Sequence, residues 1–133
     1  MDRALLLTRD YVTTRRQFGT TIGSFQAVQH RIADMACEVE LCRSILFRLL
    51  SVFDRHGDER ERILAAAKVQ FGKGGFFVGA QTVQLHGGMG MTDEYVAGML
   101  FKRLVLLKNL HGGPEAALAR LGRDQRELAR EHA

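Results

Sequence analysis

A long run of apolar residues spaced three and four apart constrains this chain more than any other feature. The members of the run are Phe25, Val28, Ile32, Met35, Val39, Cys42, Leu46, Leu49 and Phe53. This spacing places them on one side of an α-helix, and Leu41, Ile45 and Leu50 widen the stripe toward a core. A helix of about 30 residues is about 45 Å long, which is typical of antiparallel bundles.

The other segments are helical as well. Residues 3–16 carry a short amphipathic pattern, and a third helix is expected from Asp58 to Leu85. That helix is rich in glycine, which favours close approach of a neighbouring helix or subunit. A fourth helix ends near Leu110, and Gly112-Gly113-Pro114 opens a last one. We predict an all-α fold, an antiparallel four-helix bundle with a short extra C-terminal helix, in a single domain spanning residues 1–133.

Charge and cysteine usage narrow the class of partner. The net charge of +4 comes mainly from basic residues in the segments 3–16 and 102–108, whereas the tail after Pro114 is balanced, and no stripe of interleaved aromatics accompanies them. This favours a local anionic ligand such as a pyrophosphate over nucleic acid. Cys37 and Cys42 lie five apart on one expected helix, so they suit neither a disulfide nor a metal site.

The sequence pattern does not predict a membrane-spanning segment or a signal peptide. No stretch is apolar enough to span a bilayer, and the first residues lack the layout of a signal peptide. We therefore expect a cytoplasmic protein in a reducing compartment, with no metal, no membrane partner and no nucleic acid.

Two motifs suggest a ligand site. The first, Arg15-Arg16-Gln17-Phe18-Gly19, follows the first helix, and the second, residues 84–90, reads Q-L-H-G-G-M-G at the end of the third. Helices one and three of an antiparallel bundle run the same way, so both motifs should meet at one end. Guanidinium groups, an aromatic ring and a glycine-lined edge suit a nucleotide cofactor. The alternative is two solvated helix ends, with His86 as a capping or packing residue.

Several motifs in register resemble one known family. R-x-Q-F-G is matched by Arg15, Gln17, Phe18 and Gly19, followed by F-Q at Phe25 and Gln26 and A-D-M at Ala33, Asp34 and Met35. An alanine-lysine pair, Ala67 and Lys68, stands sixteen residues before Gln84, where Q-x-x-G-G-x-G begins. From about Arg3 to Gly113 the chain is similar to the C-terminal helical domain of the acyl-CoA dehydrogenase family of flavoenzymes.

The resemblance implies a bundle that normally follows an N-terminal helical domain and a middle β-domain, both absent from this sequence. It also implies FAD at a subunit interface in a homo- or hetero-oligomer. In the family, the neighbouring subunit holds most of the flavin, and this domain contacts its ADP part. The resemblance assigns that contact to Arg15, Gln17, Phe18, Gln84, Leu85, Gly87 and Gly88. An acyl-CoA substrate, electron-transferring flavoprotein as electron acceptor and a role in fatty acid metabolism follow from the same resemblance.

The family reaction is α,β-dehydrogenation of an acyl-CoA thioester by a glutamate base and the flavin. Many members carry that base in a Y-E-G-T motif, but this chain reads Leu110-His111-Gly112-Gly113. His111 therefore stands at the base position, and Gly113 stands where a flavin-contacting threonine is usual. Three interpretations of His111 remain open: a base, a structural or inactive position, or a position made redundant by a base elsewhere.

Three hypotheses for the whole chain follow. It is the C-terminal part of an acyl-CoA dehydrogenase that contributes to the flavin site, a catalytically inactive partner subunit of a heteromeric dehydrogenase, or a plain helical interaction module. In all three cases we expect no dehydrogenase turnover from this chain by itself.

Overall fold

The computed structural model describes residues 1–92 and 94–131. The α-helices in this part are α1 (Asp2–Thr14), α2 (Gln26–Val52), α3 (Asp58–His86), α4 (Val96–Asn109) and α5 (Gly113–Glu131). The short elements between them are strands β1 (Arg16–Gln17) and β2 (Thr20–Thr21) and the 3-10 helices η1 (Ile22–Ser24), η2 (Gly87–Met91) and η3 (Leu110–Gly112). The all-α prediction is confirmed, and the two-residue strands are an addition to it.

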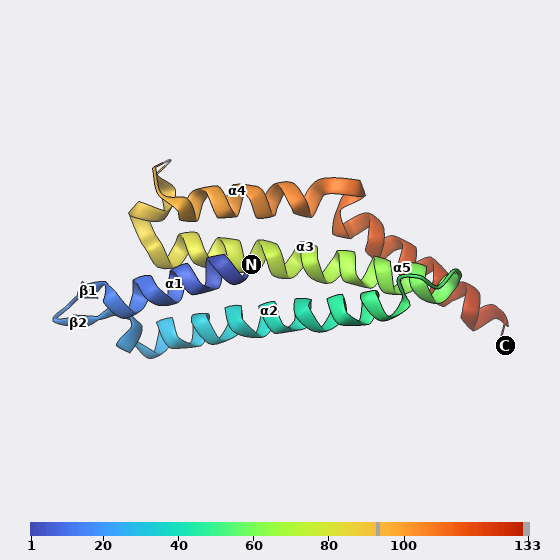
Figure 1. The fold of residues 1–133 in the computed structure, drawn as a ribbon, viewed down its shortest axis with the longest axis horizontal. Helices are drawn as coiled ribbons and strands as arrows, with labels where there is room; N and C mark the ends of the chain where they lie inside the picture. The colour runs from blue at the N-terminus through green and yellow to red at the C-terminus, as the bar shows by residue number, and fades with distance from the viewer. Residues whose placement is uncertain (93, 132–133) are drawn as a thin grey trace.

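The helices form an antiparallel bundle with α3 at its centre (Figure 1). Helix α3 packs against α1, α2, α4 and α5. Helices α1 and α3 run in the same direction, so that both end beside the β1–β2 hairpin, whereas α2 and α4 run the opposite way. The last helix, α5, was expected to be short but has 19 residues, and it crosses the beginning of α3. Both predicted cofactor motifs therefore lie at one end of the bundle.

The core is centred on the middle of α2, as the apolar run predicts. Met35 and Val39 of α2 are buried against Ala4 of α1 and Val78 of α3. Other predicted core positions of α2 are exposed, and the buried Val52 was not among those predicted. Phe25, Leu46 and Phe53 of the run, and Leu41 and Leu50 that were expected to widen it, are between 39% and 60% exposed, whereas Val52 is fully buried. Helix α1 begins beside the middle of α2, where Asp2 pairs with Arg43. Beyond that point α2 no longer lies beside α1 and packs against α3, so burial shifts to the side that touches α3.

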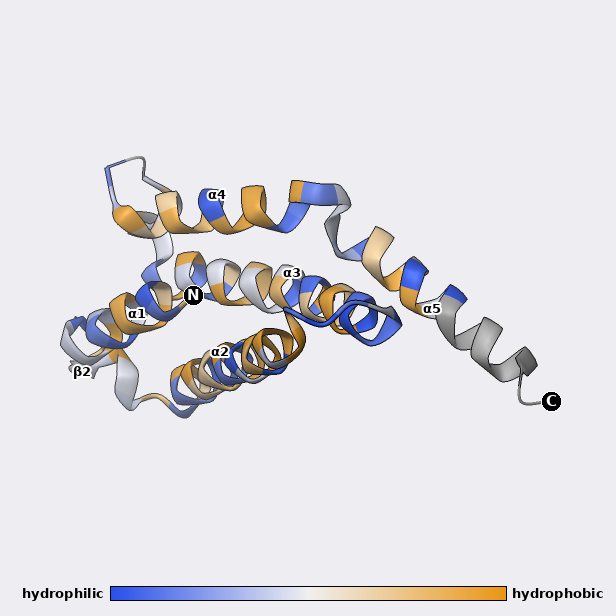
Figure 2. Ribbon diagram, turned by 45° about the vertical axis from the view of Figure 1, so that its right-hand side comes forward, coloured by the Kyte–Doolittle hydropathy of each residue, from blue (hydrophilic) through white to orange (hydrophobic). Residues whose placement is uncertain are grey.

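Glycines in α3 allow its neighbours to approach closely. A Cβ on Gly79 would lie 2.8 Å from the ring of Phe101 in α4, and a Cβ on Gly72 would lie 2.9 Å from Pro114 in α5. The central turns of α3 are pale in Figure 2 because small residues of near-neutral hydropathy dominate there. The close approach predicted for this helix is therefore met within the chain itself.

Both cysteines are free thiols, Cys37 on the surface and Cys42 in the core, where burial raises the pKa of the thiol. Across residues 1–92 and 94–131, no helix combines the length and apolar character needed to cross a bilayer.

Candidate cofactor site

A tight hairpin carries the first motif. Strand β1 pairs with β2 in the register Arg16 to Thr21 and Gln17 to Thr20, which leaves Phe18 and Gly19 as the two loop residues. Both have positive φ, 54° and 80°, as in the turns that suit a two-residue hairpin. Phenylalanine at positive φ costs about 1–2 kcal/mol. Its side chain is nevertheless 91% exposed, with an edge-on ring contact to Phe25 whose centroid lies 6.2 Å away. A strained, exposed aromatic residue is a candidate for ligand contact.

Arg15 links this hairpin to α1. It is the C-cap of α1, where its backbone N–H donates to the carbonyl of Tyr11 at 2.8 Å. Its own carbonyl accepts from the N–H of Ile22 at 2.9 Å, so the chain returns to α1 directly after β2. Gly23 permits this return, because a Cβ there would lie 2.9 Å from the carbonyl oxygen of Val12. The backbone at Arg15 is therefore fixed, while its side chain is exposed to solvent.

The glycine motif forms the end of α3 and the turn of η2. Gly87 is the C-cap, with φ 58°, and a Cβ on Gly87 or Gly88 would meet nothing within 4 Å beyond the adjacent residues. Gly90 differs, because it is buried and a Cβ there would lie 2.7 Å from the carbonyl oxygen of Val83. The first two glycines thus present open backbone to a ligand, whereas the third allows the turn itself to close.

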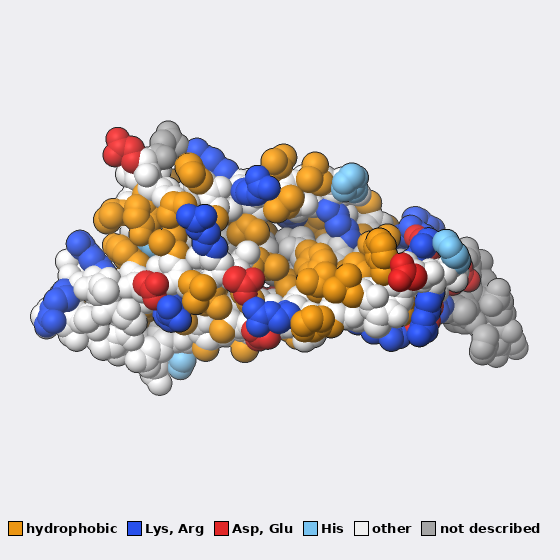
Figure 3. All heavy atoms as spheres, in the orientation of Figure 1, with side chains coloured by type: hydrophobic (Ala, Val, Ile, Leu, Met, Phe, Trp, Pro, Cys, Tyr) orange, Lys and Arg blue, Asp and Glu red, His pale blue; other side chains and the backbone are white. Residues whose placement is uncertain are grey.

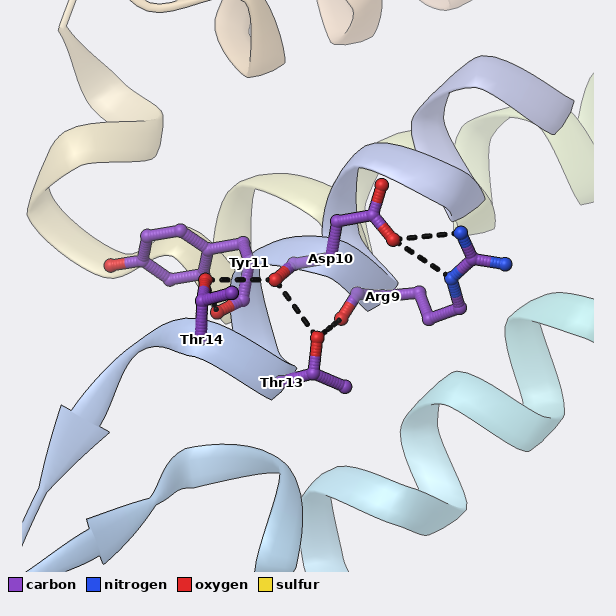
Figure 4. Close-up of polar contacts among 5 residues, drawn as sticks. All are labelled: Arg9, Asp10, Tyr11, Thr13 and Thr14. Carbon is purple, nitrogen blue, oxygen red and sulfur yellow. Dashed lines mark hydrogen bonds and ion pairs between the residues drawn. The ribbon is translucent and has the colours of Figure 1, made fainter.

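Tyr11 brings the two motifs together. Its ring lies against the ring of His86, with centroids 4.3 Å apart, and its hydroxyl is 3.9 Å from the sulfur of Met89 in η2. Figure 4 shows this ring directed toward the loop after α3, while the ion pair of Arg9 and Asp10 lies on another side of α1. Because Tyr11 is one helical turn before Arg15, this contact places the end of α1 beside the glycine loop.

His86 is buried rather than exposed. Its ring also contacts Tyr95, with centroids 5.1 Å apart, and Nδ1 lies 2.7 Å from the carbonyl oxygen of Thr82. A carbonyl only accepts hydrogen bonds, so Nδ1 carries the proton. Burial lowers the pKa of His86, and the hydrogen bond to Thr82 opposes this in part. The interpretation of His86 as a packing residue agrees with this geometry, and Tyr11 and Tyr95 are the partners that sequence reasoning missed.

His111 lies at the other end of α4. It occupies η3 with φ 55° and ψ 40°, followed by Gly112 and Gly113, which also have positive φ. Its exposed side chain lines a cavity of about 480 Å³ between α3 and α5, together with Leu64, Ala65, Lys68, Ala116, Ala117 and Arg120. Gly113 is buried at the start of α5. Helix α4 has 14 residues, so about 21 Å separates this region from the glycine loop.

Lys68 fixes the backbone that leads to His111. Its ammonium group donates hydrogen bonds to the carbonyl oxygens of Leu107, Lys108 and Leu110 at the end of α4. A cation at this position satisfies carbonyls that lack a helical partner and complements the helix dipole. In the sequence, the alanine-lysine pair stands out only through the family resemblance. Its physical role, a side-chain cap supplied by α3 to α4, depends on packing that the sequence does not display.

Seven of the eight residues predicted to contact a cofactor thus lie at one end of the bundle, whereas the eighth, Gly113, lies with His111 at the far end of α4. Arg15, Gln17 and Phe18 lie on the hairpin side and Gln84, Leu85, Gly87 and Gly88 on the loop side. Gln84 is exposed, whereas Leu85 is partly buried against the core. In the part of the chain that is described, no group of three or more His, Cys, Asp or Glu side chains could hold a metal ion.

Comparison with known proteins assigns the fold. The family model of the acyl-CoA dehydrogenase C-terminal domain matches residues 1–125. This chain belongs to the acyl-CoA dehydrogenase family. Acyl-CoA dehydrogenase IpdE2 of Mycobacterium tuberculosis is 33% identical over 120 residues, which cover 90% of this chain and 36% of that protein. Among solved structures, a Tcur3481-Tcur3483 steroid ACAD variant matches with a TM-score of 0.91 and 35% identity, over 97% of this chain and 36% of that one.

A third relative contains the cofactor. The FAD complex of PigA matches with a TM-score of 0.85 and 28% identity, over 93% of this chain and 32% of that one. The chain spans about a third of the length of these three relatives. The residues present here fit such a group. Figure 3 shows basic side chains at the end of the bundle that carries the hairpin. The ring of Phe18 in that hairpin is exposed, and Gly87 and Gly88 at the end of α3 have open backbone.

Proposed function

We propose that this acyl-CoA dehydrogenase C-terminal domain contributes one part of an FAD site, together with other domains or a neighbouring subunit, for α,β-dehydrogenation of an acyl-CoA thioester. The observation that carries the proposal is Phe18, a side chain 91% exposed on a backbone of positive φ. No contact within the described part of the chain compensates for the backbone strain and for the exposed apolar ring. Stacking of the ring on the adenine part of a nucleotide would do so.

Each nominated residue has a separate task. Arg15 supplies a charge-assisted hydrogen-bond donor for the pyrophosphate. This positive charge is needed because the dipole at the C-terminal end of a helix repels an anion. Gly87 and Gly88 let the backbone lie against a flat ligand, and Gln17 and Gln84 offer amides that both donate and accept. FAD, when bound, supplies the acceptor for the two electrons taken from the substrate, which electron-transferring flavoprotein would then receive.

The distance between the hairpin end and His111 has a consequence for how subunits would assemble. A cofactor held at the hairpin end of one chain is distant from His111 of that chain, so one chain would serve two cofactors in an oligomer. Apolar side chains left on the surface, including Phe47, Leu50, Leu106 and Met91, are between 58% and 77% exposed. Such exposure in one small domain supports contact with a partner subunit or with further domains.

The experiment that tests this proposal is an FAD titration of the purified protein, combined with its mass in solution. Saturable binding by an oligomer is expected, and Arg15→Ala and Phe18→Ala should each weaken it. Arg9→Ala is the matched control, because it removes the same charge from the same end of the chain but from a side chain that pairs with Asp10. Equal losses for Arg9→Ala and Arg15→Ala would contradict a defined phosphate contact. No binding at high micromolar FAD would contradict an independent part-site.

A second candidate function is a partner subunit that lacks its own base. The observation that favours it is His111 at the position where the family has glutamate; the solved steroid ACAD is also named for two components. His111→Glu in the assembled enzyme distinguishes the two. Restored or increased turnover would show that residue 111 stands where the base acts, whereas unchanged turnover would place the base elsewhere. The chain alone should reduce no dye with any acyl-CoA.

A further inference from the structure

His86 is the buried titratable group at this end of the bundle that the proposed function leaves unused. It is the last residue of α3, directly before Gly87 and Gly88, and it is only 3% exposed. Its ring contacts Tyr11 of α1 and Tyr95, the N-cap of α4. The ring is therefore the point at which the elements carrying the hairpin, the glycine loop and α4 meet.

The hydrogen bonding of this ring is one-sided. Nδ1 donates to the carbonyl of Thr82, whereas Nε2 is buried and has no hydrogen-bond partner among the described residues. Protonation would place a positive charge and a new N–H group at Nε2, in a buried position where no described residue supplies an acceptor. The geometry therefore favours one state, a neutral ring with its proton on Nδ1.

Thr82 makes this state part of the connection between helices. Its hydroxyl accepts a hydrogen bond from Thr8 of α1 at 3.2 Å, and both threonines are fully buried. The same residue thus ties α1 to α3 through its side chain and holds His86 through its carbonyl. Displacing the ring would disturb the place where α1 and α3 end together.

We propose that His86 is a positioning residue: as a neutral ring it holds the Gly87–Gly88 loop against the Arg15 end of α1, and protonation of Nε2 loosens the loop and weakens binding of an ADP-bearing cofactor. The part concerning the cofactor rests on the proposed function. Burial already lowers the pKa of His86, which keeps the ring neutral near pH 7.

The charged groups that the structure describes near the ring lie on exposed positions. Among the described residues, the titratable groups with a printed ring contact to His86 are Tyr11 of α1 and Tyr95 at the entry to α4. Asp10 and Glu94, which precede them in the sequence, are exposed, and Asp10 pairs with Arg9. Arg15, one turn after Tyr11, is exposed as well. On α3 itself, the preceding turn contributes the uncharged Thr82 and Val83.

The first test uses the native protein without cofactor. Long-range proton–nitrogen NMR of the histidine rings reports which nitrogen carries the proton. We expect the proton on Nδ1 at about pH 7.5, and the amide signals of Gly87 and Gly88 should shift with the same midpoint as the His86 ring. A proton on Nε2 at that pH, or glycine amides that do not follow the ring, would overturn the proposal.

The second test measures FAD affinity between about pH 8 and pH 5. The native protein should lose about tenfold, since the ring contacts that hold the loop are released. His86→Phe keeps an aromatic ring but cannot be protonated, so its affinity should stay level, while His30→Gln, at an exposed position of α2, should behave like the native protein. The same decline in His86→Phe and in the native protein would overturn the proposal. If no form binds FAD, the proposed function fails, and the glycine amide titration still decides the positioning role.

Discussion

Gly88 and Gly90 belong to the same turn, yet replacing each with alanine should have opposite consequences. A Cβ on Gly90 would lie 2.7 Å from the carbonyl oxygen of Val83 and 3.1 Å from the Cβ of His86, whereas a Cβ on Gly88 would meet nothing within 4 Å. Neither has positive φ, so alanine is compatible with both backbones. The pair therefore separates a glycine needed for packing from one needed for access.

The expected sizes follow from these distances. Alanine gains about 0.4–1 kcal/mol at a compatible position, because it restricts the unfolded chain. At Gly90 the methyl group meets backbone, which moves only with the whole turn, and such overpacking costs about 1–3 kcal/mol. The free energy of unfolding should therefore fall by about 1–2 kcal/mol for Gly90→Ala, with a melting temperature about 4–8 °C lower. Gly88→Ala should be unchanged or slightly more stable.

Circular dichroism during heating and urea denaturation measures both variants, and an FAD titration completes the comparison. Gly88→Ala should bind FAD more weakly at full stability, because its methyl group stands where the cofactor would approach. Gly90→Ala with native stability would refute the steric reasoning. Equal destabilisation of both variants would refute the assignment of Gly88 to an open, ligand-facing edge.

The remaining predictions test other contacts. Lys68→Met removes the hydrogen bonds to three carbonyls at the end of α4 and should lower the free energy of unfolding by about 2 kcal/mol, as measured by urea denaturation. The control Lys73→Met, at an exposed position of α3, should change it little. Phe18→Gly should be as stable as the native protein or up to about 1 kcal/mol more stable, because strain at φ 54° is relieved, while FAD affinity falls; a marked loss of stability would contradict this. Since burial lowers the pKa of His86 in the folded state, the unfolded chain binds more protons below about pH 6.5, so denaturation midpoints should fall from pH 7 to pH 5, and less so in His86→Phe.

Periodicity determined the helices of this protein because it depends only on neighbours along the chain. The spacing from Val28 to Cys42 predicted the buried side of α2, and Gly112-Gly113-Pro114 predicted the break before α5. The motifs around Phe18 and Gly87 were placed at one end by the direction of the helices alone. The family followed from the separations between those motifs, and the comparisons confirm it.

Tertiary structure decided three features that the sequence pattern did not predict. These are the burial of Val52 in place of Phe53, the hairpin at Phe18, and the contacts of His86 with Tyr11 and Tyr95. Tyr11 and His86 are 75 positions apart in the numbering of the sequence, and no local pattern marks them as partners. The same holds for Lys68 and the carbonyls at the end of α4. A helix's own pattern says which side is apolar, but what meets that side depends on where its neighbours begin and end, and that is a property of the packed bundle.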